Sequence, residues 1–260
     1  FGDPHEWWGY VGDVSTWRVV DLPHDWSIEL ERDAANPSGA SGGFFEMGRG
    51  WYHKTFDAPE TWRGKKVFVE FEGVYMNAEV WLNGTLLGRH PYGYTSFVYD
   101  LTPYLNVGGE NVLRVMVDNS HQRNSRWYSG SGIYRYVWLM VADPVHVVEW
   151  GVYVTTPDVS PESARVHVET SVVNGTAQAC DAVVRTSIVA PDGAVAGTAE
   201  TNAALDPGGA VVYAQDVTVA QPALWSPETP SLYWLETVVM AGDRIVDTAT
   251  TPFGIRSLHF

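Results

Sequence analysis

The stretch from Arg123 to Gly132 combines the side chains that a sugar-binding loop needs. It holds arginine, asparagine and serine beside Trp127 and Tyr128, and it ends with two glycines. Aromatic rings pack against the apolar C–H faces of a sugar, whereas guanidinium and amide groups hydrogen-bond its hydroxyls. The stretch lies between expected strands that end near Asp118 and begin near Ile133, and loops of this length often carry function. In the alternative interpretation, the two rings only anchor the loop and an arginine pairs with an acid.

Other chemistry has weaker support in the sequence. Glu70 and Glu72 are the nearest local pair of carboxylates, but they share one face of an expected strand and fit a solvated edge better than a catalytic pair. No Gly-x-Ser-x-Gly elbow precedes a helix, and strand residues follow the Gly130–Gly132 run where a phosphate loop would have a helix. His24 and Asp25 follow a proline, a pattern typical of a local hydrogen-bonding turn, with a metal site or proton relay as the less common alternative.

The overall composition excludes several classes of partner. The formal net charge is −15, which argues against nucleic acid and anionic membranes because both attract cationic surfaces. Cys180 is the only cysteine, so no internal disulfide forms, and no Cys/His spacing suits zinc. No apolar run approaches the ~18–20 residues of a membrane span. The chain begins with Phe1 and has no basic-then-apolar leader, so we expect an excised piece whose compartment cannot be read.

Hydrophobic residues alternate with a period of two nearly everywhere, which predicts an all-β fold. Val67, Val69 and Phe71 share one strand face, and Asn83-Gly84 favours a type I′ hairpin turn. No convincing helix of about ten residues or more stands out. Further alternating sets start at Ala78, Leu113, Val137, Val166, Ala182 and Leu232, and turns are expected at 191–193 and 242–243. Short strands at this spacing are typical of β-sandwiches.

A sharp change in composition divides the chain near Asp143-Pro144. Of the 34 aromatic residues, 26 lie within residues 1–142, and all three lysines lie there too. The remainder is rich in alanine, valine and threonine. We therefore expect two sandwich domains, with one large sandwich of uneven core as the alternative.

Several stretches together resemble glycoside hydrolase family 2, in particular its β-galactosidases. They occur in the family's order and cover nearly the whole chain: Trp17–Trp26, Gly50–Phe56, Ala78–Gly84, Tyr92–Phe97, Arg126–Arg135, Leu224–Tyr233 and Phe253–Arg256. The Leu22–Trp26 stretch favours a β-galactosidase over a β-glucuronidase or β-mannosidase.

The resemblance implies a jelly-roll (galactose-binding-like) sandwich at 1–143 and a seven-stranded immunoglobulin-like β-sandwich at 144–256. Residues 257–260 would begin a (β/α)₈ barrel that carries the two catalytic glutamates. On this basis the chain holds no catalytic residue, metal or cofactor, and the 260-residue piece alone is inactive. The parent would hydrolyse terminal β-galactosides with retention of configuration. Its expected partners are a carbohydrate and the intramolecular barrel, with no nucleic acid and no membrane.

The candidate substrate-binding residues are Asn124, Arg126, Trp127, Tyr128 and Asp25. Some β-galactosidases of the family place an acid two positions before the loop tryptophan, where this chain has Ser125. We therefore expect Arg126 or Asn124 to substitute for that acid, or the loop to be structural. An autonomous carbohydrate-binding or adhesion module remains the alternative from a different functional class.

Overall fold

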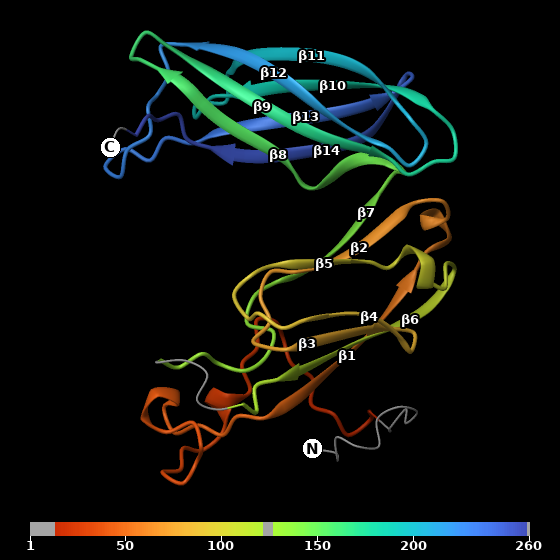
Figure 1. Ribbon diagram of the computed structural model, residues 1–260, viewed down its shortest axis with the longest axis vertical. Helices are drawn as coiled ribbons and strands as arrows, with labels where there is room; N and C mark the ends of the chain where they lie inside the picture. The colour runs from red at the N-terminus through yellow and green to blue at the C-terminus, as the bar shows by residue number, and fades with distance from the viewer. Residues whose placement is uncertain (1–13, 122–126, 259–260) are drawn as a thin grey trace. The chain divides into compact units, whose positions relative to one another are not determined.

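The computed structural model describes residues 14–121 and 127–258, and the regular secondary structure of these residues is almost entirely β-strand. The chain divides into two compact units, Phe1–Val141 and Ala142–Phe260, each built from β-strands (Figure 1). The helical segments among the described residues are four 3₁₀ turns of three residues each. None of the described helices is long and apolar enough to cross a membrane.

The first unit is a sandwich of two antiparallel sheets. One sheet has the order β1-β6-β3-β4 and the other β5-β2-β7, as the lower part of Figure 1 shows. The strands are β1 (Arg49–Ala58), β2 (Lys66–Phe71), β3 (Ala78–Leu82), β4 (Thr85–His90), β5 (Phe97–Asp100), β6 (Gly109–Asp118) and β7 (Val137–Ala142). The 3₁₀ turns are η1 (Ser27–Glu29), η2 (Ala40–Gly42), η3 (Glu60–Trp62) and η4 (Thr102–Tyr104).

The core of the first unit lies between the inward faces of these two sheets. Val67, Val69 and Phe71 of β2 are buried, and they pack with alternate residues of β3 and β6. The predicted Asn83-Gly84 hairpin is confirmed, because both residues have positive φ and join β3 to β4. The burial of β7 differs from its sequence pattern, since both Leu139 and Val141 are about two-fifths exposed.

The second unit is a seven-stranded sandwich within the described residues, as the immunoglobulin-like prediction requires. Its strands are β8 (Val145–Val159), β9 (Ser163–Asn174), β10 (Cys180–Val189), β11 (Val195–Leu205), β12 (Ala210–Ala220), β13 (Tyr233–Ala241) and β14 (Arg244–Phe253). Their sheet orders are β11-β10-β13-β14 and β12-β9-β8. The expected turns after β10 and β13 are confirmed, with Gly193 and Gly242 at positive φ.

A buried hydrogen bond joins the two sheets of the second unit. Thr186 Oγ1 of β10 donates to Gln215 Oε1 of β12 at 2.6 Å, and Gln215 Nε2 donates to the Val184 carbonyl at 3.0 Å. Valine and leucine side chains from both sheets fill the space around this pair. Because buried polar groups are costly unless they are paired, the bond fixes one registration of the sheets.

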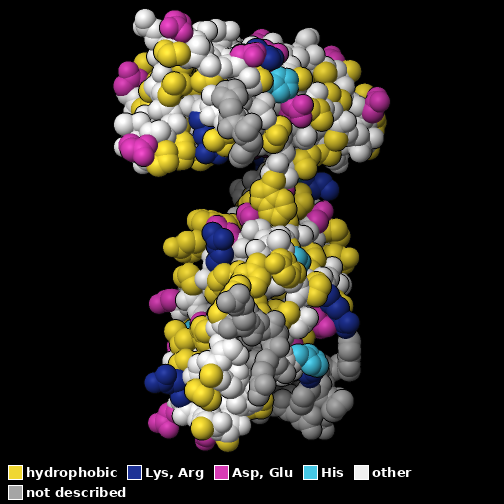
Figure 2. Space-filling model, turned by 60° about the vertical axis from the view of Figure 1, so that its left-hand side comes forward, with side chains coloured by type: hydrophobic (Ala, Val, Ile, Leu, Met, Phe, Trp, Pro, Cys, Tyr) yellow, Lys and Arg dark blue, Asp and Glu magenta, His cyan; other side chains and the backbone are white. Residues whose placement is uncertain are grey.

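Surface charge agrees with the acidic composition. Asp and Glu side chains are spread over both units in the view of Figure 2, and hydrophobic side chains are prominent on the displayed face of the first unit. No group of three or more His, Cys, Asp or Glu side chains within the described part of the chain is arranged to hold a metal ion.

The candidate loop begins at the end of β6, where Asp118 fixes the backbone. Its carboxylate accepts hydrogen bonds from Arg49 Nε at 2.6 Å and from the Ser120 backbone N–H at 2.9 Å. Burial by itself raises the pKa of Asp118, but the hydrogen bonds from Ser120 and Arg49 outweigh burial and hold the pKa below its usual value. The ionised carboxylate thus stabilises the start of the loop.

We expect Asp118→Asn to lower the free energy of unfolding by about 1–2 kcal/mol at pH 7. A carboxyl whose folded-state pKa is depressed contributes stability above its unfolded pKa, and this contribution is lost as the pH falls through the folded pKa. The difference from wild type should therefore shrink below about pH 4. Urea titrations followed by tryptophan emission measure it, because nine of the twelve tryptophans lie in the first unit. Asp57→Asn is the control, because Asp57 is exposed. If the difference in unfolding free energy between wild type and Asp118→Asn stays constant with pH, the Asp118 carboxylate does not have the stabilising role given to it here.

Candidate functional site

Residues 127–133 of the candidate loop lie against the segment 24–27. Backbone hydrogen bonds join the two: the His24 N–H donates to the Ile133 carbonyl at 2.8 Å, and the Trp26 N–H donates to the Ser131 carbonyl at 3.0 Å. The next strand, β7, begins at Val137, so the prediction of a strand start near Ile133 was wrong. Residues 131–133 are instead held by the backbone of the segment 24–26 and by a bridge between Gly132 and Tyr75.

The carboxylate of Asp25 is the centre of this arrangement. Its Oδ1 accepts the backbone N–H of Ser27 at 3.0 Å and that of Ser131 at 2.8 Å. Its Oδ2 accepts the hydroxyl of Tyr128 at 2.6 Å. A carboxylate that accepts several N–H and O–H bonds is well satisfied without water. Asp25 therefore ties the loop to a segment more than a hundred residues earlier in the sequence.

A buried cluster of the polar side chains of Ser27, Asn119 and Ser131 also holds the loop. Ser27 Oγ donates to Ser131 Oγ at 2.7 Å, and Asn119 Nδ2 donates to the Gly130 carbonyl at 2.7 Å and to Ser131 Oγ at 2.9 Å. All three side chains are at most 1% exposed. Sequence reasoning missed Ser27 and Asn119 as site residues, because nothing in their local sequence indicates contacts across such a distance.

Two glycines let the loop approach this cluster. Gly130 has φ +69°, and a Cβ at this position would lie 2.7 Å from Asp25 Oδ2. Gly132 has φ +134°, and a Cβ there would lie 2.5 Å from the His24 carbonyl oxygen. Both the backbone conformation and the lack of space require glycine. The two glycines therefore allow the chain to turn tightly against Asp25 and His24.

Neighbouring tyrosines complete the contact between the two segments. His24 Nδ1 is 2.7 Å from the Tyr52 hydroxyl, which accepts the Ile133 N–H at 3.3 Å. Burial raises the pKa of Tyr52 well above its usual value. Burial, together with the hydrogen bond to Asp25 and its negative charge, does the same for the pKa of Tyr128. Both phenols therefore remain protonated, and Tyr128 remains a donor to Asp25.

The hydrogen bonds of His24 and Asp25 reach further than the local turn expected from sequence. His24 Nε2 lies 3.1 Å from Arg18 Nη2 and 3.4 Å from Glu29 Oε2, in addition to the contact with Tyr52. Asp25 does accept the local Ser27 bond, but its other two donors come from the candidate loop. The prediction of a purely local device was therefore too narrow.

Trp127 differs from the other described side chains of the loop because its ring faces solvent. It is 58% exposed, whereas Tyr128 is half-buried and its ring contacts Phe45 edge-on at 5.6 Å. The site therefore presents an aromatic ring at the start of a segment, residues 128–133, that hydrogen bonds hold in place. Such a surface can bind and orient a ligand. The other two candidates, Asn124 and Arg126, lie outside the described residues.

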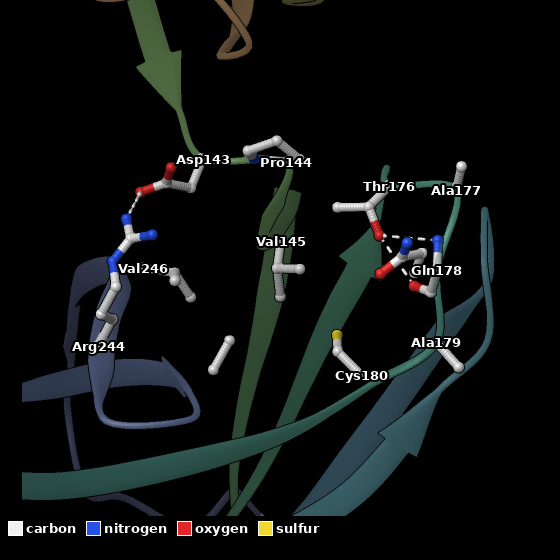
Figure 3. Close-up of a pocket in the computed structure, with 11 residues that line it drawn as sticks. Asp143, Pro144, Val145, Thr176, Ala177, Gln178, Ala179, Cys180, Arg244 and Val246 are labelled. Carbon is white, nitrogen blue, oxygen red and sulfur yellow. Dashed lines mark hydrogen bonds and ion pairs between the residues drawn. The ribbon is translucent and has the colours of Figure 1, made fainter.

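Two other locations carry less chemistry. Glu72 is not a free surface acid: it accepts the Trp138 indole N–H at 2.8 Å and lies 3.4 Å from Arg135. In the second unit, a hollow of about 550 Å³ lies between the Asp143–Arg244 pair and the Thr176–Cys180 turn (Figure 3). Small apolar side chains make up much of its lining, and the hydroxyl of Thr176 is already bonded to Asn174 and Gln178.

Comparisons with known proteins identify the family of this chain. The sugar binding domain of glycosyl hydrolases family 2 matches residues 40–143, and a second model of the same family matches residues 145–256. The chain belongs to glycoside hydrolase family 2.

Curated relatives and solved structures cover most of this chain. A β-galactosidase of Bacteroides ovatus is 48% identical over 93% of the chain, and a putative β-glucuronidase of Formosa agariphila is 36% identical over 95%. A family 2 crystal structure from Bacteroides cellulosilyticus matches the whole chain with a TM-score of 0.94 and 35% identity. The chain spans 28% and 23% of the two curated relatives and 34% of the solved chain.

We expect Asp25→Ala to lower the free energy of unfolding by about 2–4 kcal/mol, because it leaves the Ser131 N–H and the Tyr128 hydroxyl without their acceptor. Asp25→Asn should cost less, since its amide oxygen still accepts from Ser27 and Ser131. Urea denaturation of the 260-residue chain measures both. Asp21→Ala serves as the control, because Asp21 is an exposed carboxylate shortly before the segment 24–27. Equal stability of Asp25→Ala and Asp21→Ala would rule out the role assigned to Asp25.

Proposed function

We propose that this chain is the non-catalytic N-terminal part of a retaining β-glycosidase that acts on terminal β-galactosides. The observation that carries the proposal is the exposed Trp127 next to the hydrogen-bonded residues 128–133, within the region matched by the family's sugar binding domain. The 48% identical relative named a β-galactosidase favours galactosides. A β-glucuronidase parent is the second candidate, supported by the printed names of several other relatives.

The loop contributes binding and orientation. Trp127 stacks against the apolar face of the terminal sugar, and Arg126 and Asn124 hydrogen-bond its hydroxyls. Asp25 and Tyr128, proposed from sequence as direct contacts, act through the loop, because their polar atoms already bond each other. Holding the ring in place before the sugar arrives lowers the entropic cost of binding.

In the proposed enzyme, two carboxylates cleave the glycosidic bond, and both lie in a (β/α)₈ barrel outside the 260 residues. In a retaining glycosidase one carboxyl group protonates the leaving oxygen, and the other forms the glycosyl-enzyme intermediate that water then hydrolyses. We propose no cofactor site within the 260 residues themselves. The partners are the β-glycoside and the barrel of the same polypeptide, with neither nucleic acid nor membrane involved.

The test compares the complete gene product with the 260-residue chain on nitrophenyl β-galactoside and β-glucuronide. We expect turnover of the galactoside by the complete protein and none above buffer by the chain alone. Trp127→Ala in the complete protein should lower kcat/KM about 10- to 100-fold, the range expected for loss of one stacked aromatic contact of 1.4–2.7 kcal/mol.

Tyr136→Ala is the matched control, because Tyr136 is also exposed, at 55%, and lies just before β7. Unchanged kinetics for Trp127→Ala together with a destabilised fold would mean that Trp127 is only an anchor. Turnover by the 260-residue chain that is lost on mutating one of its own glutamates would overturn the assignment of the catalytic residues to the barrel. If the complete protein prefers the glucuronide, the proposed terminal sugar is glucuronic acid and not galactose.

A further inference from the structure

A second pair of exposed aromatic rings lies beside the candidate loop. Tyr92 and Tyr94 occupy the turn between β4 and β5 and are 56% and 48% exposed. Their ring centroids lie 5.7 Å apart with planes at 67° to each other, so the two rings form a corner. Large aromatic side chains that gather on a surface usually mark a binding site, whereas single exposed ones need no explanation.

The turn that carries these rings is firmly held. Gly93, between the two tyrosines, is buried: its carbonyl accepts the Tyr134 hydroxyl at 2.7 Å, and a Cβ on it would lie 2.1 Å from the Tyr75 ring. Tyr94 also packs edge-on against Tyr75, with centroids 5.2 Å apart. On the far side of the turn, His90 stacks on Phe97 at 4.2 Å. The tyrosines are therefore presented by a backbone that has little freedom to let them turn inward.

The turn is continuous with the Trp127 loop. The Tyr94 hydroxyl donates to Ser129 Oγ at 3.4 Å, and Ser129 Oγ donates to the Trp127 carbonyl at 3.3 Å. Ser129 thus links the corner formed by Tyr92 and Tyr94 to the residue that presents the proposed sugar-stacking ring. The corner and the Trp127 backbone are therefore separated by only two hydrogen bonds.

The chemistry of the corner suits a neutral, hydroxyl-rich ligand. Each tyrosine offers an apolar ring face together with a phenol that both donates and accepts hydrogen bonds. Two tyrosine rings at a steep angle can contact a bulky saturated ligand on two of its sides. A flat aromatic ligand could stack on only one of the two tyrosine rings. A sugar unit has the bulky, saturated shape.

We propose that Tyr92 and Tyr94 bind the sugar unit that is joined to the terminal sugar through the scissile bond. This is the unit on the leaving-group side. This inference rests on the proposed function. It makes the preferred substrate a β-linked oligosaccharide, because a small glycoside reaches Trp127 but leaves the tyrosine corner empty.

The test measures the complete enzyme on two substrates with the same terminal sugar: its methyl β-glycoside and a β-linked trisaccharide. The variants are Tyr92→Leu and Tyr94→Leu, singly and together, because leucine keeps apolar bulk while it removes the ring face. The double variant should lower kcat/KM for the trisaccharide about ten-fold, mainly through a higher KM, and change the methyl glycoside less than about two-fold.

Tyr104→Leu is the matched control. Tyr104 is 43% exposed in η4, and its carbonyl bonds Asn83 at the opposite end of β4 from the Tyr92–Tyr94 turn. It should leave both substrates unchanged. An equal loss on both substrates in the double variant, or a lower Tm with no change in substrate preference, would overturn the inference because the rings would then serve packing.

Trp127→Ala separates this inference from the proposed function on which it rests. If Trp127→Ala lowers kcat/KM for both substrates while the tyrosine variants do not discriminate, only the tyrosine corner is refuted. If Trp127→Ala leaves both substrates unchanged, the role of the loop itself fails.

Discussion

The candidate site depends on one carboxylate. Asp25 accepts the backbone N–H of Ser131 and the hydroxyl of Tyr128, and these two bonds define the path of the loop that presents Trp127. Charge-assisted hydrogen bonds are about twice as strong as neutral ones, so a single acidic side chain can hold residues 128–131 of the loop against the segment 24–27. The exposed ring follows from this constraint, because Tyr128 is drawn inward while its neighbour points to solvent.

The cost of placing a charge under the loop is offset locally. Ser27 donates its backbone N–H to the same carboxylate, and Gly130 leaves room for it where any other residue would collide. Below it, Ser27, Asn119 and Ser131 satisfy one another with hardly any exposure to water. Fully paired polar clusters of this kind specify one backbone arrangement, whereas a partly paired cluster would be unstable. Residues 128–131 are therefore firmly held beside the large exposed side chain of Trp127.

The sequence predicted those features that depend on local periodicity. Alternating residues of β2, the Asn83-Gly84 hairpin and the all-β architecture follow from side-chain spacing and turn chemistry, which act over a few residues. The partners of Asp25 did not follow, because hydrogen bonds between residues 25 and 131 leave no local pattern. The start of β7 was placed too early for a related reason: the aromatic run after Gly132 alternates like a strand, but its first residues bond the segment at 24–26.

Amide hydrogen exchange of Ser131, measured by NMR in the 260-residue chain, tests the role of Asp25 most directly. The Ser131 N–H has the Asp25 carboxylate as its acceptor, so its exchange reports the bond on which the loop depends. We predict protection comparable to the β6 amides in the wild type and a large loss of that protection in Asp25→Ala, with the β6 amides far less affected. Exchange of Ser131 at the rate of an unstructured peptide in the wild type would contradict the account.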